Sequence, residues 1–181
     1  ALRMVAVQAV VALPVALAFL VGDGLRAAAA AATGGLALAL GNAVAVSRRR
    51  EVVEHFFAGG GRVIDSSPMY GQAEALLGEV LPRADKRLFS ATKVWTPIGP
   101  YGPTQMRRSL SLWKLPRVDL MQIHNLLSWR SHLPTLREWK AQGLARHIGI
   151  TTSHGRDHDL VRRIVGSERG IDVLQITYSP A

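Results

Sequence analysis

The sequence contains no cysteine, and this absence removes two classes of feature at once. Neither a disulfide framework nor a thiolate metal centre can form in this chain. Acidic residues are also few: 13 Asp and Glu stand against 22 Lys and Arg, which leaves a formal net charge of +9. The basic residues do not interleave with aromatic ones, which make up only 6% of the chain. We therefore expect a basic surface suited to an anionic cofactor, and no nucleic-acid partner.

Charge is missing from two long runs near the N-terminus, Met4–Gly22 and Ala27–Val46. Each run is about long enough to cross a bilayer, and a basic triplet follows the second. Three interpretations of residues 1–46 stay open: a membrane hairpin or export signal, a pair of Ala-rich soluble helices, or non-native sequence joined to a real domain. We expect a cytoplasmic protein, with a membrane anchor or export through residues 4–46 as the alternative.

From Ser47 onward the pattern changes to an alternation of helices and apolar strands, which defines a second domain over residues 47–181. The predicted strands are Arg62–Asp65, Leu88–Lys93, Val118–His124, His147–Thr151 and Val173–Tyr178. The predicted helices are Arg48–Ala58, Ala73–Leu81, Thr104–Trp113 (with Thr104 as its cap), Thr135–Gln142 and His158–Val165. Such alternation is typical of parallel strands covered by helices.

The glycine run Gly59–Gly61 decides between two parallel α/β architectures. It precedes its strand, whereas the glycines of a dinucleotide-binding turn follow theirs. We therefore favour a (β/α)8 barrel over a doubly wound sheet. A full barrel takes about 250 residues, so the five recognisable units predict a partial barrel.

A polar residue lies at or near the carboxyl end of each predicted strand: Asp65, Lys93, His124, Thr151 and Gln175. The carboxyl ends of parallel barrel strands converge on one face, where active sites form. A lone Lys or His at a strand end is more often a surface charge or a hydrogen-bonded core residue. Five polar ends in succession instead predict a shared site.

These residues suit proton transfer to a carbonyl oxygen. Tyr70, on the loop after the first strand, is the predicted general acid, because a neighbouring ammonium such as Lys93 favours the phenolate that remains. Asp65 would orient Lys93, and His124 would donate a hydrogen bond to the same oxygen. Tyr70 would act as acid while a hydride arrives from a nicotinamide, and because side chains cannot supply a hydride, a cofactor is required.

The chain resembles the aldo-keto reductase family. The signature G-x-R-x-I-D-[ST]-[AS]-x-x-Y-G is present as Gly60–Gly71, with Glu74 and Gly78 after it. The residues that fill its variable positions resemble those of a bacterial subgroup of the family. Lys93 ends an Ala-Thr-Lys strand, and His124 ends a strand similar to the family's "DLYxIH". The resemblance covers about residues 47–181.

The resemblance implies reduction of an aldehyde or ketone with NADPH, or alternatively NADH, and a small-molecule carbonyl substrate as partner. It also implies that Thr151, Thr152 and Gln175 hold the nicotinamide carboxamide, although Thr152 replaces the family's usual Asn. The family's first strand and last two strands are not recognisable. The alternative function is therefore a truncated, catalytically incompetent fragment that acts at most as a cofactor-sensing or interaction module.

The remaining candidates concern the substrate and a metal. Trp95, Asn125 and Trp129 follow strands of the active face and are predicted to line the substrate pocket. His154 and His158 lie four residues apart beside Asp157, but no third ligand completes the set, so we expect no metal site.

Overall fold

The computed structural model of the chain describes residues 47–81, 88–153 and 157–177. Two compact units divide the chain, Ala1–Val52 and Val53–Ala181. Residues 1–46, with their three interpretations, lie outside the described residues. Among the helices that the structure describes, none combines the length and the apolar character needed to cross a membrane.

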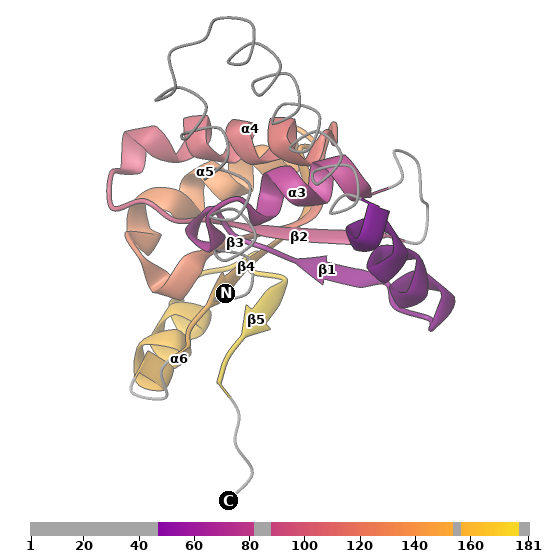
Figure 1. Cartoon of the computed structure of the whole chain (residues 1–181). Coiled ribbons are helices and arrows are strands. Elements are labelled where there is room, and N and C mark those ends of the chain that lie inside the picture. The colour runs from indigo at the N-terminus through magenta and orange to yellow at the C-terminus, as the bar shows by residue number, and fades with distance from the viewer. Residues whose placement is uncertain (1–46, 82–87, 154–156, 178–181) are drawn as a thin grey trace, which may run out of the picture. The chain divides into compact units, whose positions relative to one another are not determined.

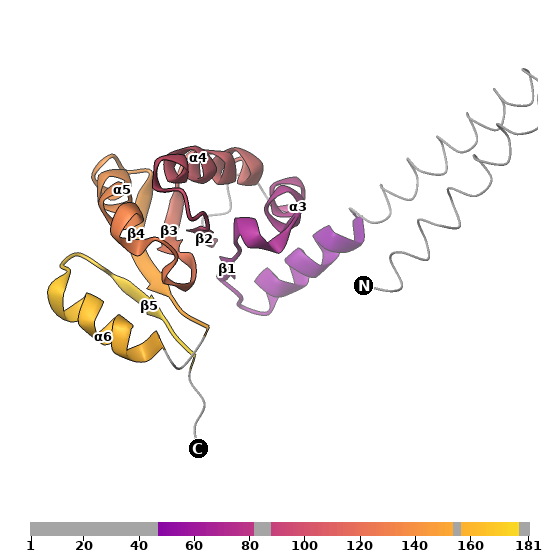
Figure 2. The ribbon, with the colours of Figure 1, turned by 90° about the vertical axis from the view of Figure 1, so that its left-hand side faces the viewer.

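In the described residues of the second unit, five strands form one parallel sheet in the order β1-β2-β3-β4-β5. The strands are β1 (Val63–Asp65), β2 (Phe89–Val94), β3 (Val118–Ile123), β4 (Ala145–Thr151) and β5 (Val173–Gln175). The helices that follow β1 to β4 are α3 (Ala73–Val80), α4 (Gly102–Trp113), α5 (Trp129–Ala141) and α6 (His158–Ser167). The sheet curls, with the helices along its outer side (Figures 1 and 2). The predicted α/β fold, a partial (β/α)8 barrel of about five units, is confirmed.

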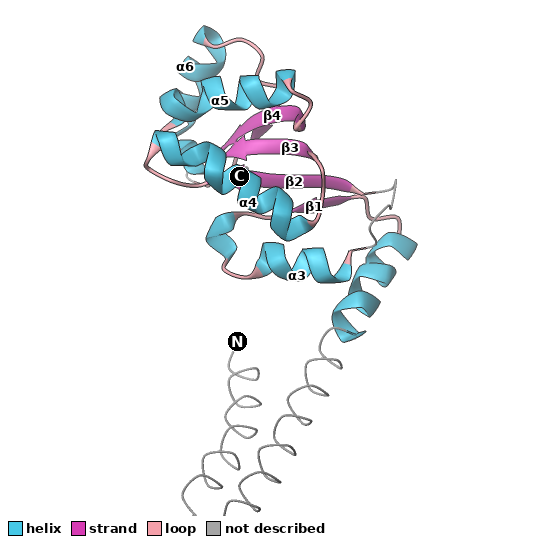
Figure 3. Ribbon diagram, turned by 90° about the horizontal axis from the view of Figure 1, so that it is seen from above, coloured by secondary structure: helices cyan, strands magenta, loops and turns pink. Residues whose placement is uncertain are grey.

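The hydrophobic core lies between the sheet and the helices that cover it. In Figure 3, α4 and α5 run along the strands at the centre of the sheet. Val118, Met121 and Ile123 of β3 are fully buried, as are Leu136 of α5 and Ile148 of β4. Full burial of each such side chain stabilises the fold by roughly 1.5–3 kcal/mol. This core makes β3 and β4 a rigid platform for the residues at their carboxyl ends.

Most predicted boundaries differ from the observed ones by only a few residues, which is the usual uncertainty of helix and strand ends. Residues 47–58 are helical, close to the predicted Arg48–Ala58. The last strand is shorter than the predicted Val173–Tyr178, because Ile176 and Thr177 belong to no strand and Tyr178 lies outside the described residues.

The predicted capping of α4 by Thr104 is wrong. The helix begins two residues earlier, at Gly102, and no side chain caps it. Pro103 occupies the first turn, where its fixed φ suits a helix and its missing N–H costs nothing. A Cβ at Gly102 would lie 2.7 Å from the ring of His132, so close packing against α5 requires glycine at this start.

The predicted start of α5 at Thr135 is also wrong, since the helix begins at Trp129 and contains Pro134. A proline inside a helix removes one backbone hydrogen bond, which is why the sequence pattern favoured a later start. Leu133 is buried in the core, and Nε2 of the fully buried His132 lies 2.8 Å from a carbonyl oxygen of the loop after β2. These tertiary contacts outweigh the lost hydrogen bond.

Helix α3 is joined to the sheet and to α4 by the carboxylate of Glu74, which is 2% exposed. Its two oxygens accept hydrogen bonds from Thr92 of β2 and from Ser109 and Trp113 of α4, at 2.6, 3.0 and 3.2 Å. All three donors are neutral. One signature residue thus fixes the helix that follows the Tyr70 loop, and no positive charge partners it in these bonds.

Candidate active site

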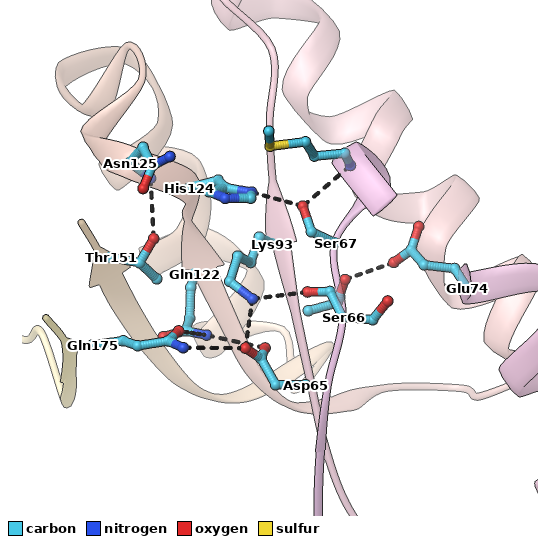
Figure 4. Close-up of polar contacts among 12 residues, drawn as sticks. Asp65, Ser66, Ser67, Glu74, Lys93, Gln122, His124, Asn125, Thr151 and Gln175 are labelled. Atoms are coloured by element: carbon cyan, nitrogen blue, oxygen red, sulfur yellow. Dashed lines mark hydrogen bonds and ion pairs between the residues drawn. The ribbon is translucent and has the colours of Figure 1, made fainter. Parts of the chain in front are cut away.

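The polar strand ends predicted from the sequence meet at the carboxyl edge of the sheet (Figure 4). Asp65, Thr151 and Gln175 are the last residues of β1, β4 and β5, Lys93 lies one residue before the end of β2, and His124 directly follows β3. The strands are three to seven residues long, and each of these five polar residues lies where a strand gives way to the next connection. The register therefore brings five residues together that are spread over 110 positions of the chain.

A partly buried ion pair lies at this edge, between the ends of β1 and β2. The side chain of Lys93 is 3% exposed, and its Nζ lies 2.6 Å from Oδ2 of Asp65, which is 27% exposed. The same ammonium donates to the backbone oxygen of Ser66 at 2.9 Å. It also lies 5.5 Å from the centroid of the Tyr70 ring. Two acceptors thus hold the ammonium in place beside the phenol.

Tyr70 and His124 face each other across the open side of the edge. Tyr70 ends the short 3-10 helix η1 (Pro68–Tyr70), and its side chain is half exposed. The rings of Tyr70 and His124 lie 5.8 Å apart in an edge-to-face arrangement. A phenol, an ammonium and an imidazole therefore lie close together at this edge, and the phenol is the exposed member.

His124 is buried, with 5% of its surface exposed. Burial, and then the positive charge of Lys93, lower the pKa of His124 below its usual value of 6.5, and the nearby Asp65 opposes this only in part. The imidazole is consequently neutral at neutral pH. A neutral imidazole carries one proton and can donate one hydrogen bond.

The three predicted cofactor-binding residues lie at the carboxyl ends of β4 and β5, and Gln175 contacts the ion pair. The Gln175 amide lies 3.4 Å from Oδ2 of Asp65. Thr151 and Thr152 are each 4% exposed. Oγ1 of Thr151 accepts the backbone N–H of Asn125, and the backbone N–H of Thr152 donates to the carbonyl of Gln175.

The predicted pocket residues are placed differently from one another. Asn125 lies at the edge itself, in a left-handed conformation (φ 52°) that non-glycine residues seldom adopt and that is common at functional sites. Trp95 directly follows β2 and is 40% exposed, and Gln105 holds its backbone through two hydrogen bonds. Trp129 instead lines a pocket with Leu160 and Ile164, and none of the four catalytic candidates borders that pocket.

Two residues of the site were missed in the sequence. Gln122, in β3, donates to Oδ1 of Asp65 at 3.4 Å and to Gln175 at 3.3 Å. Oγ of Ser67 lies 2.7 Å from Nδ1 of His124. A glutamine directly after the apolar pair Leu120–Met121 and before Ile123 was a usable signal for the first. The second joins residues 57 positions apart, and only the fold reveals it.

The metal-ligand candidates considered from the sequence were His154, Asp157 and His158. His154 lies outside the described residues. Asp157 accepts a hydrogen bond from Thr152 at 3.2 Å. Within the described residues, no group of three His, Cys, Asp or Glu side chains is arranged to hold a metal ion.

Solved structures share this arrangement of strands and helices. A Pseudomonas aeruginosa protein described as an aldo-keto reductase has a TM-score of 0.62 at 21% identity, covering 74% of this chain and 56% of that one. The holo form of a Bacillus halodurans aldo-keto reductase scores 0.61 at 22% identity, covering 74% and 47%. A Bombyx mori aldo-keto reductase in complex with NADP scores 0.58 at 22% identity, covering 74% and 49%.

At these identities the likeness establishes the fold, and the chain spans about half the length of the structures it matches. No curated protein matches the sequence significantly. The aldo/keto reductase family model matches residues 32–181, which is most of the chain and includes every strand and helix of the sheet described above. Fold and family model agree with the signature at the end of β1, and the chain belongs to the aldo/keto reductase family.

Proposed function

We propose that this chain contains the catalytic residues of a carbonyl reductase that uses a reduced nicotinamide cofactor. The carbonyl oxygen of a small aldehyde or ketone would lie between Tyr70 and His124. The observation that carries the proposal is the Lys93 ammonium, held by Asp65 and Ser66 beside the Tyr70 ring.

Tyr70 acts as the general acid. Its phenolic proton passes to the carbonyl oxygen as that oxygen gains negative charge, and the phenolate that remains is stabilised by the nearby ammonium of Lys93. Asp65 orients that ammonium through the 2.6 Å ion pair. A positioned general acid contributes about 10²–10⁴-fold to a rate.

His124 acts as a neutral hydrogen-bond donor to the same oxygen. Because its pKa is lowered by burial and by Lys93, it does not compete with Tyr70 as a strong acid at neutral pH. A donor already in place stabilises developing charge without further reorganisation. The roles of the two rings are thus distinct, with a proton from one and a hydrogen bond from the other.

The residues beside β4 and β5 fit a nicotinamide carboxamide in part. The Gln175 side chain is exposed and its amide makes only contacts of 3.3 and 3.4 Å, so it retains capacity to bind another amide. The Thr151 hydroxyl already accepts a hydrogen bond, and that of Thr152 already donates one. When bound, the cofactor would supply the hydride, which side chains cannot. NADPH is the proposed form, in line with the NADP complex of the Bombyx mori relative, and NADH is the alternative.

The test is NADPH oxidation by the purified chain with a reactive aromatic aldehyde, in the wild type and in Tyr70→Phe. We expect turnover to fall by about 10³-fold in Tyr70→Phe, because the proton donor is lost. Tyr101→Phe is the matched control, since Tyr101 is another exposed tyrosine and lies in the loop after β2, on η2 (Gly99–Tyr101). Turnover in Tyr70→Phe equal to that of the control contradicts the proposal, and no turnover in any variant supports the incompetent fragment.

A further inference from the structure

The hydroxyl of Ser67 connects the His124 ring to the turn that carries Tyr70. Its oxygen lies 2.7 Å from Nδ1 of His124 and accepts the backbone N–H of Met69 at 3.2 Å. The side chain is fully buried, so water does not compete for these contacts. Ser67 is also the N-cap of η1, the helix that ends at Tyr70 (Figure 4).

The protons in this contact can be counted. A serine hydroxyl has one hydrogen to donate, and here its oxygen already accepts the N–H of Met69. Within the described residues, the only other group bonded to this oxygen is Nδ1 of His124. If Nδ1 carried the imidazole proton, the serine hydrogen would have no acceptor in a fully buried position. Leaving a buried donor without an acceptor is unfavourable, so the hydroxyl donates to Nδ1.

The proton of the neutral imidazole then resides on the other nitrogen. Nε2 makes no hydrogen bond within the described part of the chain, while Nδ1 is occupied by Ser67. The ring edge that is left for a ligand is therefore the edge that carries the proton. The opposite tautomer would present a lone pair to the carbonyl oxygen and repel it.

We propose that Ser67 is a positioning residue that fixes His124 as its Nε2–H tautomer and, through the same hydroxyl, holds the turn that carries Tyr70. Its catalytic consequence rests on the proposed function. Its effect on the tautomer does not, because it depends only on contacts between residues of this chain. Ser67 thus couples the orientation of the hydrogen-bond donor to that of the acid.

The test is ¹⁵N NMR of the imidazole nitrogens in the full chain at about pH 8, where a histidine of lowered pKa is neutral. The His124 signals are assigned as those missing from His124→Gln. We expect a protonated Nε2 and an unprotonated Nδ1 in the wild type. Ser67→Ala should shift both signals toward a mixture of tautomers, and Ser67→Thr, which keeps the hydroxyl, should restore them.

Ser66→Ala is the control for the tautomer. Ser66 is the neighbouring residue, is 2% exposed, and its hydroxyl has no hydrogen-bond partner among the residues that the structure describes. The His124 signals should stay unchanged in this variant. A wild-type His124 protonated on Nδ1 overturns the inference without any variant, and so do unchanged signals in a folded Ser67→Ala.

Turnover separates this inference from the proposed function. With the aromatic aldehyde and NADPH, Ser67→Ala should lower kcat on the order of tenfold, about the effect of one weakened hydrogen bond, and leave KM for NADPH unchanged. If the tautomer behaves as expected but the wild type shows no turnover, the proposed function fails and the structural role of Ser67 stands. If turnover depends on Tyr70 but the His124 signals are the same in Ser67→Ala as in the wild type, only this inference fails.

Discussion

The two edges of the sheet use carboxylates in opposite ways. At the amino-terminal side, Oδ2 of Asp119 accepts the N–H and the hydroxyl of Ser90, and Oδ2 of Asp172 accepts the N–H of Ile148. Lys140 donates to both oxygens of Asp172, at 2.6 and 2.7 Å. These carboxylates tie neighbouring strands together, and their bonding capacity is largely used.

At the carboxyl edge the groups are held but not saturated. Lys93 is fixed by Asp65 and Ser66, yet it faces the half-exposed ring of Tyr70. His124 is fixed at Nδ1 and unbonded at Nε2 within the described residues. The comparison teaches that charge alone does not mark a site in this fold. What distinguishes the carboxyl edge is that His124 is held in place at one nitrogen while the other makes no bond within the described residues. Barrel enzymes place their active sites at this edge of the sheet.

The largest expected difference between the two edges is in turnover, after one lysine at each edge is replaced by methionine. Lys93→Met should lower turnover of the aromatic aldehyde by about 10³-fold or more, because the phenolate of Tyr70 loses its stabilising charge. Lys140→Met, at the other edge, should leave turnover per folded molecule unchanged. Steady-state kinetics on both variants test this. Similar losses of turnover in the two would erase the distinction between the edges.

A smaller effect is expected on stability from Asp172→Asn. Hydrogen bonds from Lys140 and from the N–H of Ile148 outweigh the opposing effect of burial and hold the pKa of Asp172 below its usual 3.8. A carboxylate with a lowered pKa stabilises the fold above that value and loses this contribution as pH falls through the folded-state pKa. Asp172→Asn should therefore cost about 1 kcal/mol at neutral pH, or roughly 3–5 °C in Tm.

Below the folded-state pKa of Asp172 the difference between this variant and the wild type should vanish. Thermal melts of both proteins across acidic pH provide the measurement. A destabilisation that persists unchanged at the lowest pH would show that the Asp172 charge is not its cause.

The smallest effect concerns His124 and lies in a different pH window. Its pKa is lowered, so the unfolded chain takes up the proton more readily, and stability should fall as pH drops below 6.5 toward the folded-state pKa. The groups that face this ring are Lys93, Asp65, Tyr70 and Ser67. Melts of wild type and His124→Gln should diverge as pH falls below 6.5, above the window of Asp172. Parallel curves over that range would argue against a buried neutral His124.

Much of this fold could be predicted, because parallel strands leave a plain record in sequence. The apolar run before His124 and the polar residue at each strand end determined both the sheet and the edge where the site forms. The start of α5 could not be predicted, since Pro134 signals a break locally and the burial of Leu133 that overrides it is a tertiary effect. The start of α4 at Gly102 likewise depends on the His132 ring of the next helix.

The site was predicted as a set of residues but not as a network. Asp65, Lys93 and His124 are brought together as expected, and their catalytic roles stay predictions that the kinetics above address. Gln122 and Ser67 enter only through contacts between strands and turns distant in the chain. Trp129 shows the limit of inference from a strand end, because its position after β3 did not indicate that it would line a pocket with α6.

The most direct test of the central claim, that the carboxyl edge reduces a carbonyl, is deuterium transfer from NADPH labelled at the reactive carbon of its nicotinamide. The wild type should yield an alcohol with deuterium on the former carbonyl carbon, and both Tyr70→Phe and Lys93→Met should form about 10³-fold less of it per unit time. An alcohol without deuterium, or equal labelled yields from the wild type and these two variants, would contradict the account.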